Sequence, residues 1–188
     1  MLILASNSPR RHQLLKLITE DFVIKASDIE ETLDEKVGIN RAIEDLAYKK
    51  ALFVFKNHPE DIIIGADTVV CLKNDILGKP KDREDAILML KNLSDKTHLV
   101  ITGVSIISKI ASINFNVTTE VSFYDLSDKQ IIDYVDNYQP FDKAGAYAIQ
   151  DKAAVFVKEI KGDYYNIMGL PVARLNRELA MIEQLINK

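Results

Sequence analysis

The sequence predicts an α/β protein in which helices cover the faces of a mixed, twisted β-sheet. Strand-like and helix-like segments alternate along the first half of the chain, which is typical of helices packed on a sheet. Two segments rich in Val, Ile and Thr, residues 98–107 and 110–123, are separated only by a tight turn at 108–109, which predicts a β-hairpin. These observations give the fold class but not the order of the strands.

Length and composition limit the class of protein. The 188 residues match one domain, at about 150 residues per domain, so we expect a single domain over 1–188. Hydrophobic residues make up 47% and charged residues 28%, as in globular proteins. Lys and Arg number 24 against 28 Asp and Glu, so the net charge of −4 disfavours a nucleic-acid polymer as partner.

Membrane insertion and disulfide formation are also disfavoured. The best apolar run, residues 62–72, has 11 residues and includes Asp67, whereas a spanning helix needs about 20. The N-terminal residues lack the basic region of a signal peptide, so we expect a cytoplasmic protein. Cys71 is the single cysteine of the sequence, and its apolar surroundings predict a small buried side chain.

The first elements follow from apolar periodicity. Residues 2–5 predict a short buried strand, and residues 9–18 a helix with one apolar face. Residues 22–25 are a candidate second strand. Residues 41–55 predict a helix, for which Asn40 is the expected N-cap.

The middle of the chain predicts a buried strand followed by a capped helix. Residues 61–72 are apolar and rich in β-branched side chains, and Gly65 is expected to break or bend this strand. Residues 83–93 predict a helix capped by Asp82, before the hairpin strands described above.

Three elements complete the prediction. Ser127-Asp-Lys-Gln130 matches a capping box, which should begin a helix that continues to Tyr138. Residues 154–160 predict a strand, and residues 171–186 predict a closing helix with Pro171 in its first turn.

The first candidate site is Ser6-Asn-Ser-Pro-Arg-Arg11. A strand, a polar turn and Pro9 at the first helical position make Ser8 the expected N-cap. The free amides of a helix start attract anions, and Arg10 and Arg11 add positive charge, so the pattern predicts a phosphate site. The alternative is that both arginines are solvated surface charges.

The second candidate is Asp67, a lone carboxylate in an apolar run. Such a group is costly to bury unless it is paired or bound to a metal. Gly65 and Ala66 lack bulk, which predicts space for a ligand beside Asp67. The alternative is a structural role at a strand end, with Asp67 or Thr68 capping backbone amides.

Other candidates are less specific on their own. Lys79 lies between Gly78 and Pro80, which is also typical of a surface turn. Residues 28–31 and the pair 49–50 could equally be solvated charges. Residues 142–150 and 162–171 hold three of the seven glycines and several polar groups: Asp142, Lys143, Gln150, Asp163 and Asn166.

Motifs that the sequence lacks narrow the chemistry. Neither G-x-x-x-x-G-K-[ST] nor G-x-G-x-x-G occurs, which excludes a P-loop and a Rossmann dinucleotide site. His12, His58 and His98 have no ligand spacing, which disfavours zinc. A site built from Asp and Glu oxygens would suit Mg²⁺ or Mn²⁺ shared with substrate phosphates.

Six short motifs, taken in order, resemble those of the Maf family of nucleoside triphosphate pyrophosphatases. They are Ser6-Asn-Ser-Pro-Arg-Arg11, Gly65-Ala-Asp-Thr-Val-Val70, Gly78-Lys-Pro80, Thr102-Gly-Val104, Asp142-Lys-Ala-Gly-Ala-Tyr147 and Gly169-Leu-Pro171. Each fragment is short, but the ordered set extends from residue 6 to residue 171. The resemblance implies a Maf/Ham1-like α/β fold related to inosine triphosphate pyrophosphatases, with two lobes, a cleft and often a homodimer.

The resemblance also implies roles for individual residues. Asp67 matches the family's general base or metal-linked carboxylate, and Arg10 and Arg11 match phosphate and specificity residues, beside the expected N-cap Ser8. Three further positions match an acid and two lysines that line the cleft: Glu31, Lys50 and Lys79. Their neighbours Glu30 and Lys49 are alternatives one position away.

Two positions bear on base preference. Thr68 and Gln150 match positions that separate the subgroups, and Gln150 resembles the dTTP/UTP subgroup rather than the 7-methyl-GTP subgroup, which has an acidic residue there. An amide can donate and accept, as needed to read the edge of uracil or thymine. The family usually has glycine where this chain has Asp95, in a turn away from the chemistry.

The implied activity is hydrolysis of dTTP and UTP, with modified pyrimidine nucleotides as further candidates, to the monophosphate and pyrophosphate. Glu31 and Asp67 would hold Mg²⁺ or Mn²⁺, and Asp67 would activate water. Three alternatives stay open: a methylated purine substrate such as 7-methyl-GTP, a nucleotide-binding regulator of septum formation without turnover, and a general phosphatase.

Overall fold

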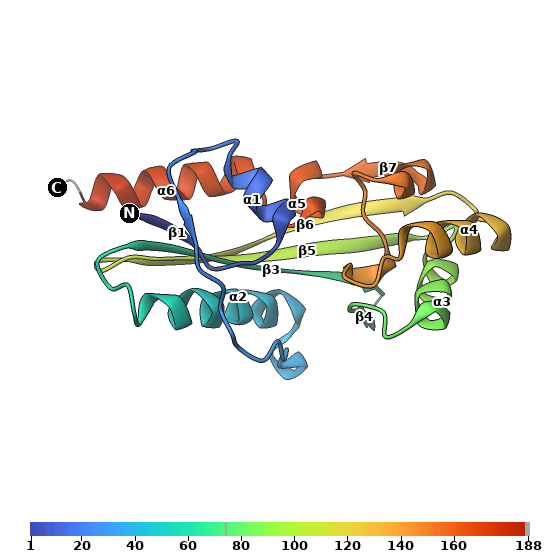
Figure 1. Ribbon diagram of the computed structural model, residues 1–188, viewed down its shortest axis with the longest axis horizontal. Coiled ribbons are helices and arrows are strands. Elements are labelled where there is room, and N and C mark those ends of the chain that lie inside the picture. Colours follow the sequence, from blue (N-terminus) through green and yellow to red (C-terminus); the bar gives the residue numbers. More distant parts are fainter. Residues whose placement is uncertain (74, 187–188) are drawn as a thin grey trace. The chain divides into compact units, whose positions relative to one another are not determined.

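The computed structural model describes residues 1–73 and 75–186. Its strands form a seven-stranded sheet with the order β2-β1-β3-β5-β6-β7, and β4 pairs with β3 (Figure 1). Their bounds are β1 Leu2–Leu4, β2 Val23–Ile24, β3 Ile62–Leu72, β4 Asp75–Leu77, β5 Thr97–Ile107, β6 Ser112–Phe123 and β7 Val157–Lys161. β1 is parallel to β2 and β3, whereas β4 and β7 are antiparallel to their partners, which confirms the predicted mixed sheet.

The helices lie between and beside these strands in the sequence. They are α1 Pro9–Leu15, α2 Ile39–Phe55, α3 Arg83–Leu93, α4 Asp128–Tyr138, α5 Tyr164–Met168 and α6 Val172–Ile186. Short 3-10 turns occur at Glu35–Val37, Ala144–Ala146 and Lys152–Phe156. Within the described part of the chain, no helix combines the length and the apolar character that crossing a membrane would require.

The chain divides into two compact units. Unit 1 consists of Met1–Asp67, Thr102–Val117 and Gly169–Lys188, and unit 2 consists of Thr68–Ile101 and Thr118–Met168. Each unit has its own hydrophobic core. The prediction of one domain stays a prediction.

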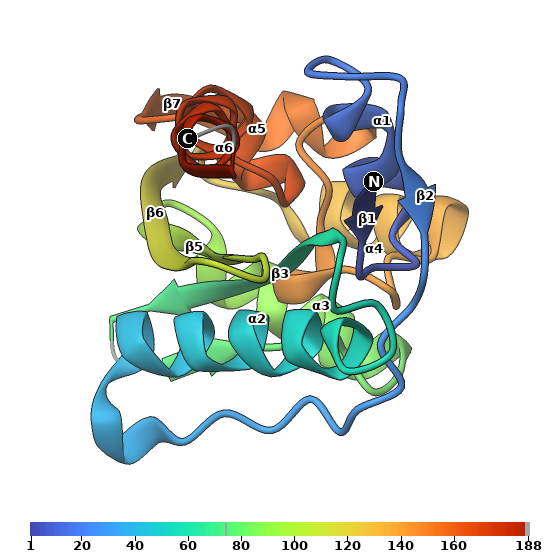
Figure 2. The same cartoon turned by 90° about the vertical axis from the view of Figure 1, so that its left-hand side faces the viewer.

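In unit 1, α2 lies on one face of the strands and α1 and α6 lie on the other (Figures 1 and 2). The core beneath α2 is aliphatic, because the helix turns small and branched side chains toward the sheet. Its buried members are Ile3, Ala5, Ala51, Val54, Ile63 and Ile107.

The core of unit 2 contains larger side chains than the core of unit 1, and some of them are aromatic. Phe123 lies at its centre, with its ring 4.9 Å from that of Tyr147 and 6.1 Å from that of Phe156. Helices α3 and α4 add Leu90, Leu93 and Ile131, and Arg83 of α3 forms an ion pair with Asp136 of α4.

Two predicted helix starts are confirmed. Asp82 accepts a hydrogen bond from the Asp85 amide at 2.8 Å and so caps α3. Ser127 and Gln130 form the complete capping box of α4. Both motifs involve residues three apart, so local sequence is enough to specify them.

Two predicted helix limits are wrong. Helix α2 begins at Ile39 after Gly38, not after Asn40, because Gly38 adopts a φ of +81° and the chain enters the helix earlier. Helix α1 ends at Leu15 rather than residue 18, since the amides of Leu17 and Ile18 bond three residues back, which tightens the chain into a turn.

The strand predictions also need correction. β3 is continuous from Ile62 to Leu72 and is not broken at Gly65. The strand predicted at 154–160 is present as β7 but begins later, at Val157, because the 3-10 turn Lys152–Phe156 precedes it. The side chain of Asp151 accepts a hydrogen bond from the Ala153 amide at 3.0 Å, which begins that turn. The hairpin loop spans 108–111, and the Ser108 amide closes it on the Ala111 carbonyl at 2.8 Å.

Candidate active site

Three charged side chains from distant parts of the sequence meet in unit 1. Lys50 comes from α2, Asp67 from β3, and Glu31 from the irregular segment before α2. The Lys50 ammonium lies 2.6 Å from Glu31 Oε1 and also contacts the Asp67 carboxylate. Its one positive charge is therefore shared by two carboxylates.

The periodicity of α2 explains why Lys50, and not Lys49, makes these contacts. The buried face of the helix includes Leu46, Ala47, Lys50 and Ala51, so the Lys50 side chain is buried, at 6% exposed. A buried ammonium is stable only if it is paired. Lys49, one position along, is exposed. The structure thus brings together Glu31, Lys50 and Asp67, as chosen from the sequence.

Exposure differs sharply between the two acids. Asp67 is 14% exposed, whereas Glu31 is 48% exposed. A carboxylate that is nearly buried and touches an ammonium is held in one place, and one on an exposed segment can move. Asp67 is therefore the enclosed acid of the pair, and Glu31 is the more exposed one.

Arg11 is held beside these acids by the backbone and by Ser6. Its Nε donates to the Gly169 carbonyl at 2.8 Å, and its Nη1 donates to Ser6 Oγ at 3.4 Å. Burial lowers the pKa of Arg11, and the negative charge of Asp67 opposes that shift. Arg10 lowers the pKa further by repulsion, and Glu31 raises it. Arg10 and both acids therefore act electrostatically on Arg11.

The hydrogen bonds at the start of α1 differ from those expected from the sequence. Ser8 is the N-cap residue, as predicted, but its side chain makes no capping hydrogen bond. Ser6 takes the organising role instead, since its hydroxyl accepts from the Ser8 amide at 3.2 Å and its carbonyl contacts His12 Nε2 at 2.7 Å. The sequence analysis missed the supporting roles of Ser6 and Gly169, although both lie in the motifs that carry the resemblance.

Gly65 does not leave space for a ligand, contrary to the expectation. A Cβ atom at Gly65 would lie 2.3 Å from the Ala47 carbonyl oxygen of α2, so the helix backbone fills that space. Glycine is needed there for close packing of helix on strand.

Unit 2 brings together two segments that the sequence singled out. The Gly145 amide donates to the Gly78 carbonyl at 3.0 Å, which ties the segment 142–150 to the turn that contains Lys79. Gly145 has a φ of +67°, and a Cβ atom there would lie 3.0 Å from the Val70 side chain. The segment around Gly145 therefore packs closely on β3 at Val70, which is two residues after Thr68.

Gln150 is exposed, and hydrogen-bonded residues precede and follow it in the sequence. Tyr147 is buried, with its hydroxyl 2.8 Å from His98 Nε2. Asp151 accepts from the Tyr134 hydroxyl at 3.2 Å and from the Ala153 amide. The sequence analysis treated His98 as isolated, because its partner Tyr147 lies 49 residues away.

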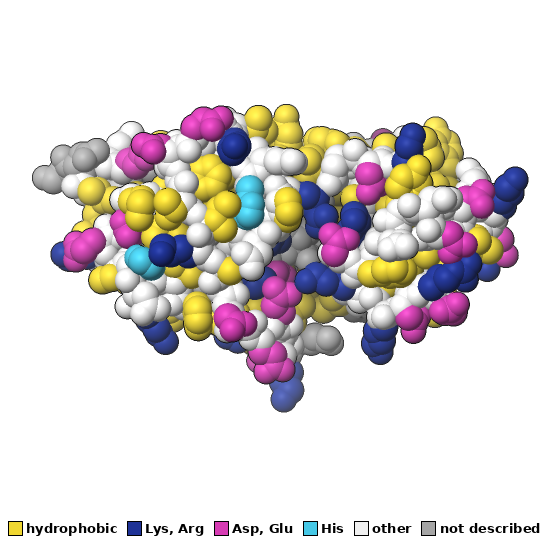
Figure 3. All heavy atoms as spheres, viewed as in Figure 1, with side chains coloured by type: hydrophobic (Ala, Val, Ile, Leu, Met, Phe, Trp, Pro, Cys, Tyr) yellow, Lys and Arg dark blue, Asp and Glu magenta, His cyan; other side chains and the backbone are white. Residues whose placement is uncertain are grey.

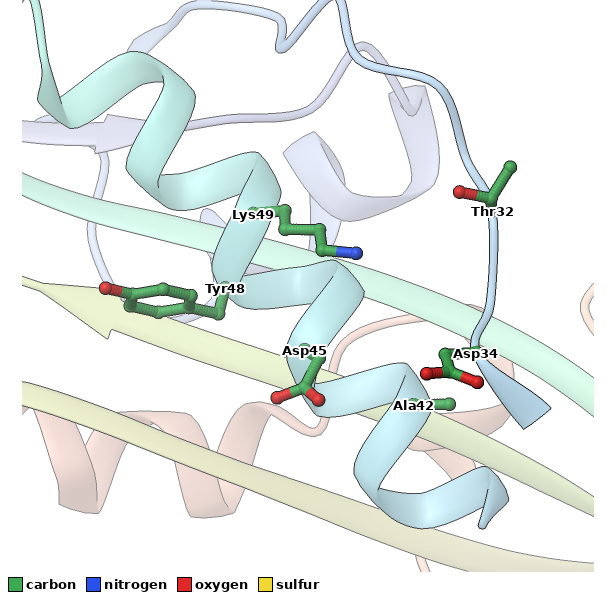
Figure 4. Close-up of a pocket in the computed structure, with 6 residues that line it drawn as sticks. All are labelled: Thr32, Asp34, Ala42, Asp45, Tyr48 and Lys49. Carbon is green, nitrogen blue, oxygen red and sulfur yellow. The ribbon is translucent and has the colours of Figure 1, made fainter. Parts of the chain in front are cut away.

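A shallow pocket of about 250 Å³ lies between α2 and the segment that precedes it (Figure 4). Its lining consists of Thr32, Asp34, Ala42, Asp45, Tyr48 and Lys49. Figure 4 shows Lys49 extended toward the segment that carries Thr32, and Tyr48 turned the other way. Asp45 is paired with Arg41 at 3.0 Å, so the pocket has mixed charge and is not a clear anion site.

The donor set fits a hard divalent cation. Mg²⁺ and Mn²⁺ favour oxygen ligands and are commonly bound by one or two carboxylates together with substrate phosphates. Glu31 and Asp67 meet at one ammonium and could offer such oxygens. Among the described residues, no three side chains of His, Cys, Asp or Glu form a ready metal cluster, so the carboxylates alone would not complete the coordination.

On the face shown in Figure 3, basic and acidic side chains are interspersed and do not form one broad basic surface.

The arrangement of the strands and helices defines a class of fold that solved structures share. The structure of the Staphylococcus aureus Ham1 protein matches with a TM-score of 0.56 at 16% identity, covering 95% of this chain and 97% of that one. A HAM1 protein from Coxiella burnetii matches with a TM-score of 0.56 at 15% identity, covering 96% and 98%. At these identities the likeness shows a Ham1-like fold.

The sequence comparisons are more specific. The family model for Maf-like protein matches residues 1–182. A relative from Geobacillus sp. (strain WCH70), named dTTP/UTP pyrophosphatase, is 49% identical over 178 residues, covering 95% of this chain and 96% of the relative. A Bacillus cereus (strain ATCC 14579) protein of the same name is 46% identical over 182 residues, covering 97% and 95%. The chain belongs to the Maf family.

Proposed function

We propose that this protein is a nucleoside triphosphate pyrophosphatase that hydrolyses dTTP and UTP to the nucleoside monophosphate and pyrophosphate. The observation that carries the proposal is the buried Lys50 ammonium held between Glu31 and Asp67, with Arg11 acting on the same acids. The names of two relatives at 46% and 49% identity support the substrate class. Modified pyrimidine triphosphates are further candidates.

The proposed chemistry is attack of water on the phosphoanhydride between the α- and β-phosphates. Asp67 orients the water and takes its proton, since it is the more enclosed of the two acids. Lys50 holds the Asp67 carboxylate in position and neutralises charge that develops on the phosphates. Electrostatic stabilisation of this kind is commonly the largest contribution to such a reaction.

Four basic side chains are proposed to bind the triphosphate: Arg10, Arg11, Lys50 and Lys79. Ser8 is proposed to contact substrate near the start of α1. Hydrogen bonds from guanidinium groups to phosphate oxygens are charge-assisted, and two can form in parallel. Lys79 lies in a turn restricted by Gly78 and Pro80, which limits the freedom that it would lose on binding.

We also propose that the reaction uses Mg²⁺ or Mn²⁺, held by Glu31 and Asp67. When bound, such an ion would polarise phosphate oxygens. With the metal ion bound, Lys50 and Arg11 would still hold the two carboxylates in place.

Base preference is proposed to come from Gln150, Thr68 and Arg10. Gln150 could donate to and accept from the edge of uracil or thymine. A site built around specific hydrogen bonds can reject a wrong base strongly, because its polar groups are then left unpaired. Cytoplasmic location and a homodimer also stay predictions.

The deciding experiment measures pyrophosphate and orthophosphate released from UTP, dTTP, ITP and 7-methyl-GTP, each with Mg²⁺ or Mn²⁺. We expect pyrophosphate from UTP and dTTP. The control is Asp67→Asn, which should lose at least about 100-fold in kcat, the scale of a lost general base, while its thermal melting shows a folded protein.

Each other outcome identifies an alternative. Orthophosphate alone would indicate a general phosphatase, and preference for a purine would overturn the base assignment. Binding of UTP without turnover by the wild-type protein would favour a nucleotide-binding regulator of septum formation.

A further inference from the structure

Two glycines in neighbouring strands lie directly under helix α2. A Cβ atom at Gly65 of β3 would lie 2.3 Å from the Ala47 carbonyl oxygen and 2.7 Å from the Ala51 nitrogen. A Cβ atom at Gly103 of β5 would lie 2.4 Å from the Ile43 carbonyl oxygen. Real Cβ atoms essentially never approach a non-bonded heavy atom to less than 3.0 Å. The backbone of α2 therefore rests on these strands with no side chain between them.

The two contacts fall on one line along the helix. Ile43, Ala47 and Ala51 are spaced four residues apart, so they lie on the same side of α2. β3 and β5 are neighbours in the sheet, and α2 runs beside them in both ribbon views (Figures 1 and 2). Gly65 and Gly103 thus set the height of the helix above the sheet at two points.

This height bears directly on the candidate active site. Lys50 is the residue before Ala51, and Asp67 is two residues after Gly65 on the same strand. Residues two apart on a strand face the same side, so Gly65 and Asp67 both face α2. The close approach of α2 to Gly65 therefore lies next to the contact between Lys50 and Asp67.

We propose that Gly65 and Gly103 are positioning residues that seat α2 so that the Lys50 ammonium meets the Asp67 carboxylate. The inference rests on the proposed function, in which that contact supports turnover. Neither glycine needs to touch substrate for this role. Glycine is required at both positions by the helix backbone rather than by φ, since neither residue has a positive φ.

A shift of α2 away from the sheet should affect the two contacts of Lys50, with Asp67 and with Glu31, unequally. An alanine at Gly103 would force α2 outward by about 1 Å, to restore ordinary van der Waals contact. Asp67 belongs to the strand and cannot follow the helix. Glu31 lies on an irregular, more exposed segment and can follow. We therefore expect the Lys50–Asp67 contact to be lost and the Lys50–Glu31 contact to survive.

The test is a double-mutant cycle between Gly103→Ala and Lys50→Met, with pyrophosphate release from UTP as the readout. Gly103→Ala alone should lower kcat at least about tenfold, with KM changed less than about threefold, because an interaction needed mainly in the transition state is weakened. In the Lys50→Met background, Gly103→Ala should lower kcat less than about twofold further.

The matched control distinguishes an effect of the position of α2 on kcat from an effect of reduced protein stability. Leu46→Ala removes a buried side chain of the same helix without pushing the helix off the sheet. It should lower the melting temperature but leave kcat of the folded enzyme within about twofold, since large-to-small changes mainly affect stability. If Gly103→Ala lowers kcat equally in both backgrounds, or not at all in a folded protein, the proposal is wrong.

Two further measurements keep the result decisive. If Gly103→Ala does not fold, Ala51→Val makes a milder intrusion between α2 and β3 at a fully buried position, and the same cycle is run with it. If the wild-type enzyme releases no pyrophosphate, the proposed function fails. Crystal structures of the wild type and the variant then test whether the two glycines position α2, through the Lys50–Asp67 and Lys50–Glu31 distances. An unmoved Lys50 in the variant would overturn the inference.

Discussion

At the scale of single residues, two buried basic groups illustrate opposite uses of charge. Lys50 is paired with two carboxylates, and the proposed reaction uses this cluster of charges. His98 is 1% exposed and lies among aromatic rings and the Tyr147 hydroxyl, and its burial lowers its pKa and so favours the neutral ring.

Lys49 and Lys50 form a natural pair for testing the catalytic assignment. Lys50→Met should lower kcat for UTP about 100-fold or more, because a preorganised charge beside Asp67 is removed. Lys49→Met, at an exposed position of the same helix turn, should leave kcat within about twofold. Steady-state pyrophosphate release by both variants checks the expectation. Equal losses would place the important charge on the surface of α2 instead.

His98 should make stability depend on pH. Burial lowers the pKa of His98 to about 4, from about 6.5 in the unfolded chain. Between these values the unfolded chain binds more protons, so the free energy of unfolding falls as pH drops from 6.5 to 4 and is unaffected by this group above 6.5. At about 1.4 kcal/mol per pH unit, the loss approaches about 3 kcal/mol.

Urea unfolding of the wild type, His98→Gln and His58→Gln at pH 7, 6, 5 and 4.5 measures this effect. His98→Gln should show a smaller loss of stability toward acid pH than the wild type. His58 is partly exposed, so His58→Gln should follow the wild type. Parallel curves for all three proteins would mean that His98 does not cause the dependence.

At the scale of elements, two of the four predicted helix caps form the expected side-chain hydrogen bonds. The Asp82 cap and the Ser127–Gln130 box act over three residues, and both were predicted correctly. Elements set by distant contacts were not. β4 and α5 are too short to show periodicity, and the Asn40 cap was wrong because Gly38 opens α2 earlier.

The candidate site divides in the same way. Asp67 stood out from the residues themselves, as a carboxylate in an apolar strand. The meeting of Glu31 with Lys50 could not be derived from spacing, since Glu31 lies on an irregular segment, and its choice over Glu30 came from the family resemblance. The packing role of Gly65 was missed, because a glycine that leaves space for a helix and one that leaves space for a ligand look alike in sequence.

The cap of α3 offers a prediction at this scale. Asp82→Ala should reduce the free energy of unfolding by about 1 kcal/mol, because the Asp85 amide loses its hydrogen-bond partner. For a chain of this length that is a shift in Tm of about 2–4 °C. Glu84→Ala, an exposed change in the same turn, is the control and should shift Tm by less. A larger loss for Glu84→Ala would contradict the capping assignment.

At the scale of the whole molecule, a Ham1-like fold recurs in solved structures at 15–16% identity. The chain has a net charge of −4, and its proposed substrate is a polyanion. The proposed function therefore relies on local basic groups rather than on the overall electrostatic field for affinity. Binding should consequently be specific and measurable as stabilisation of the folded protein.

Ligand-linked stability tests base preference apart from turnover. Analogues of UTP and ITP with a nitrogen bridge between the α- and β-phosphates resist hydrolysis. At 100 times its Kd, the UTP analogue should stabilise the enzyme by about 2.7 kcal/mol, which raises Tm by roughly 5–10 °C. The ITP analogue at the same concentration should raise Tm by only a few degrees, because its base leaves the Gln150 amide unpaired.

Gln150→Glu supplies the internal comparison for this measurement. A carboxylate cannot donate as the amide does, so the variant should bind the UTP analogue more weakly and show a smaller difference between the two ligands. Gln150 is exposed, so the unliganded variant should melt within about 1 °C of the wild type. Equal stabilisation of the wild type by both analogues would show that the protein binds the triphosphate without reading the base. The pyrimidine preference would then be wrong, while proposed pyrophosphate release would still stand on its own assay.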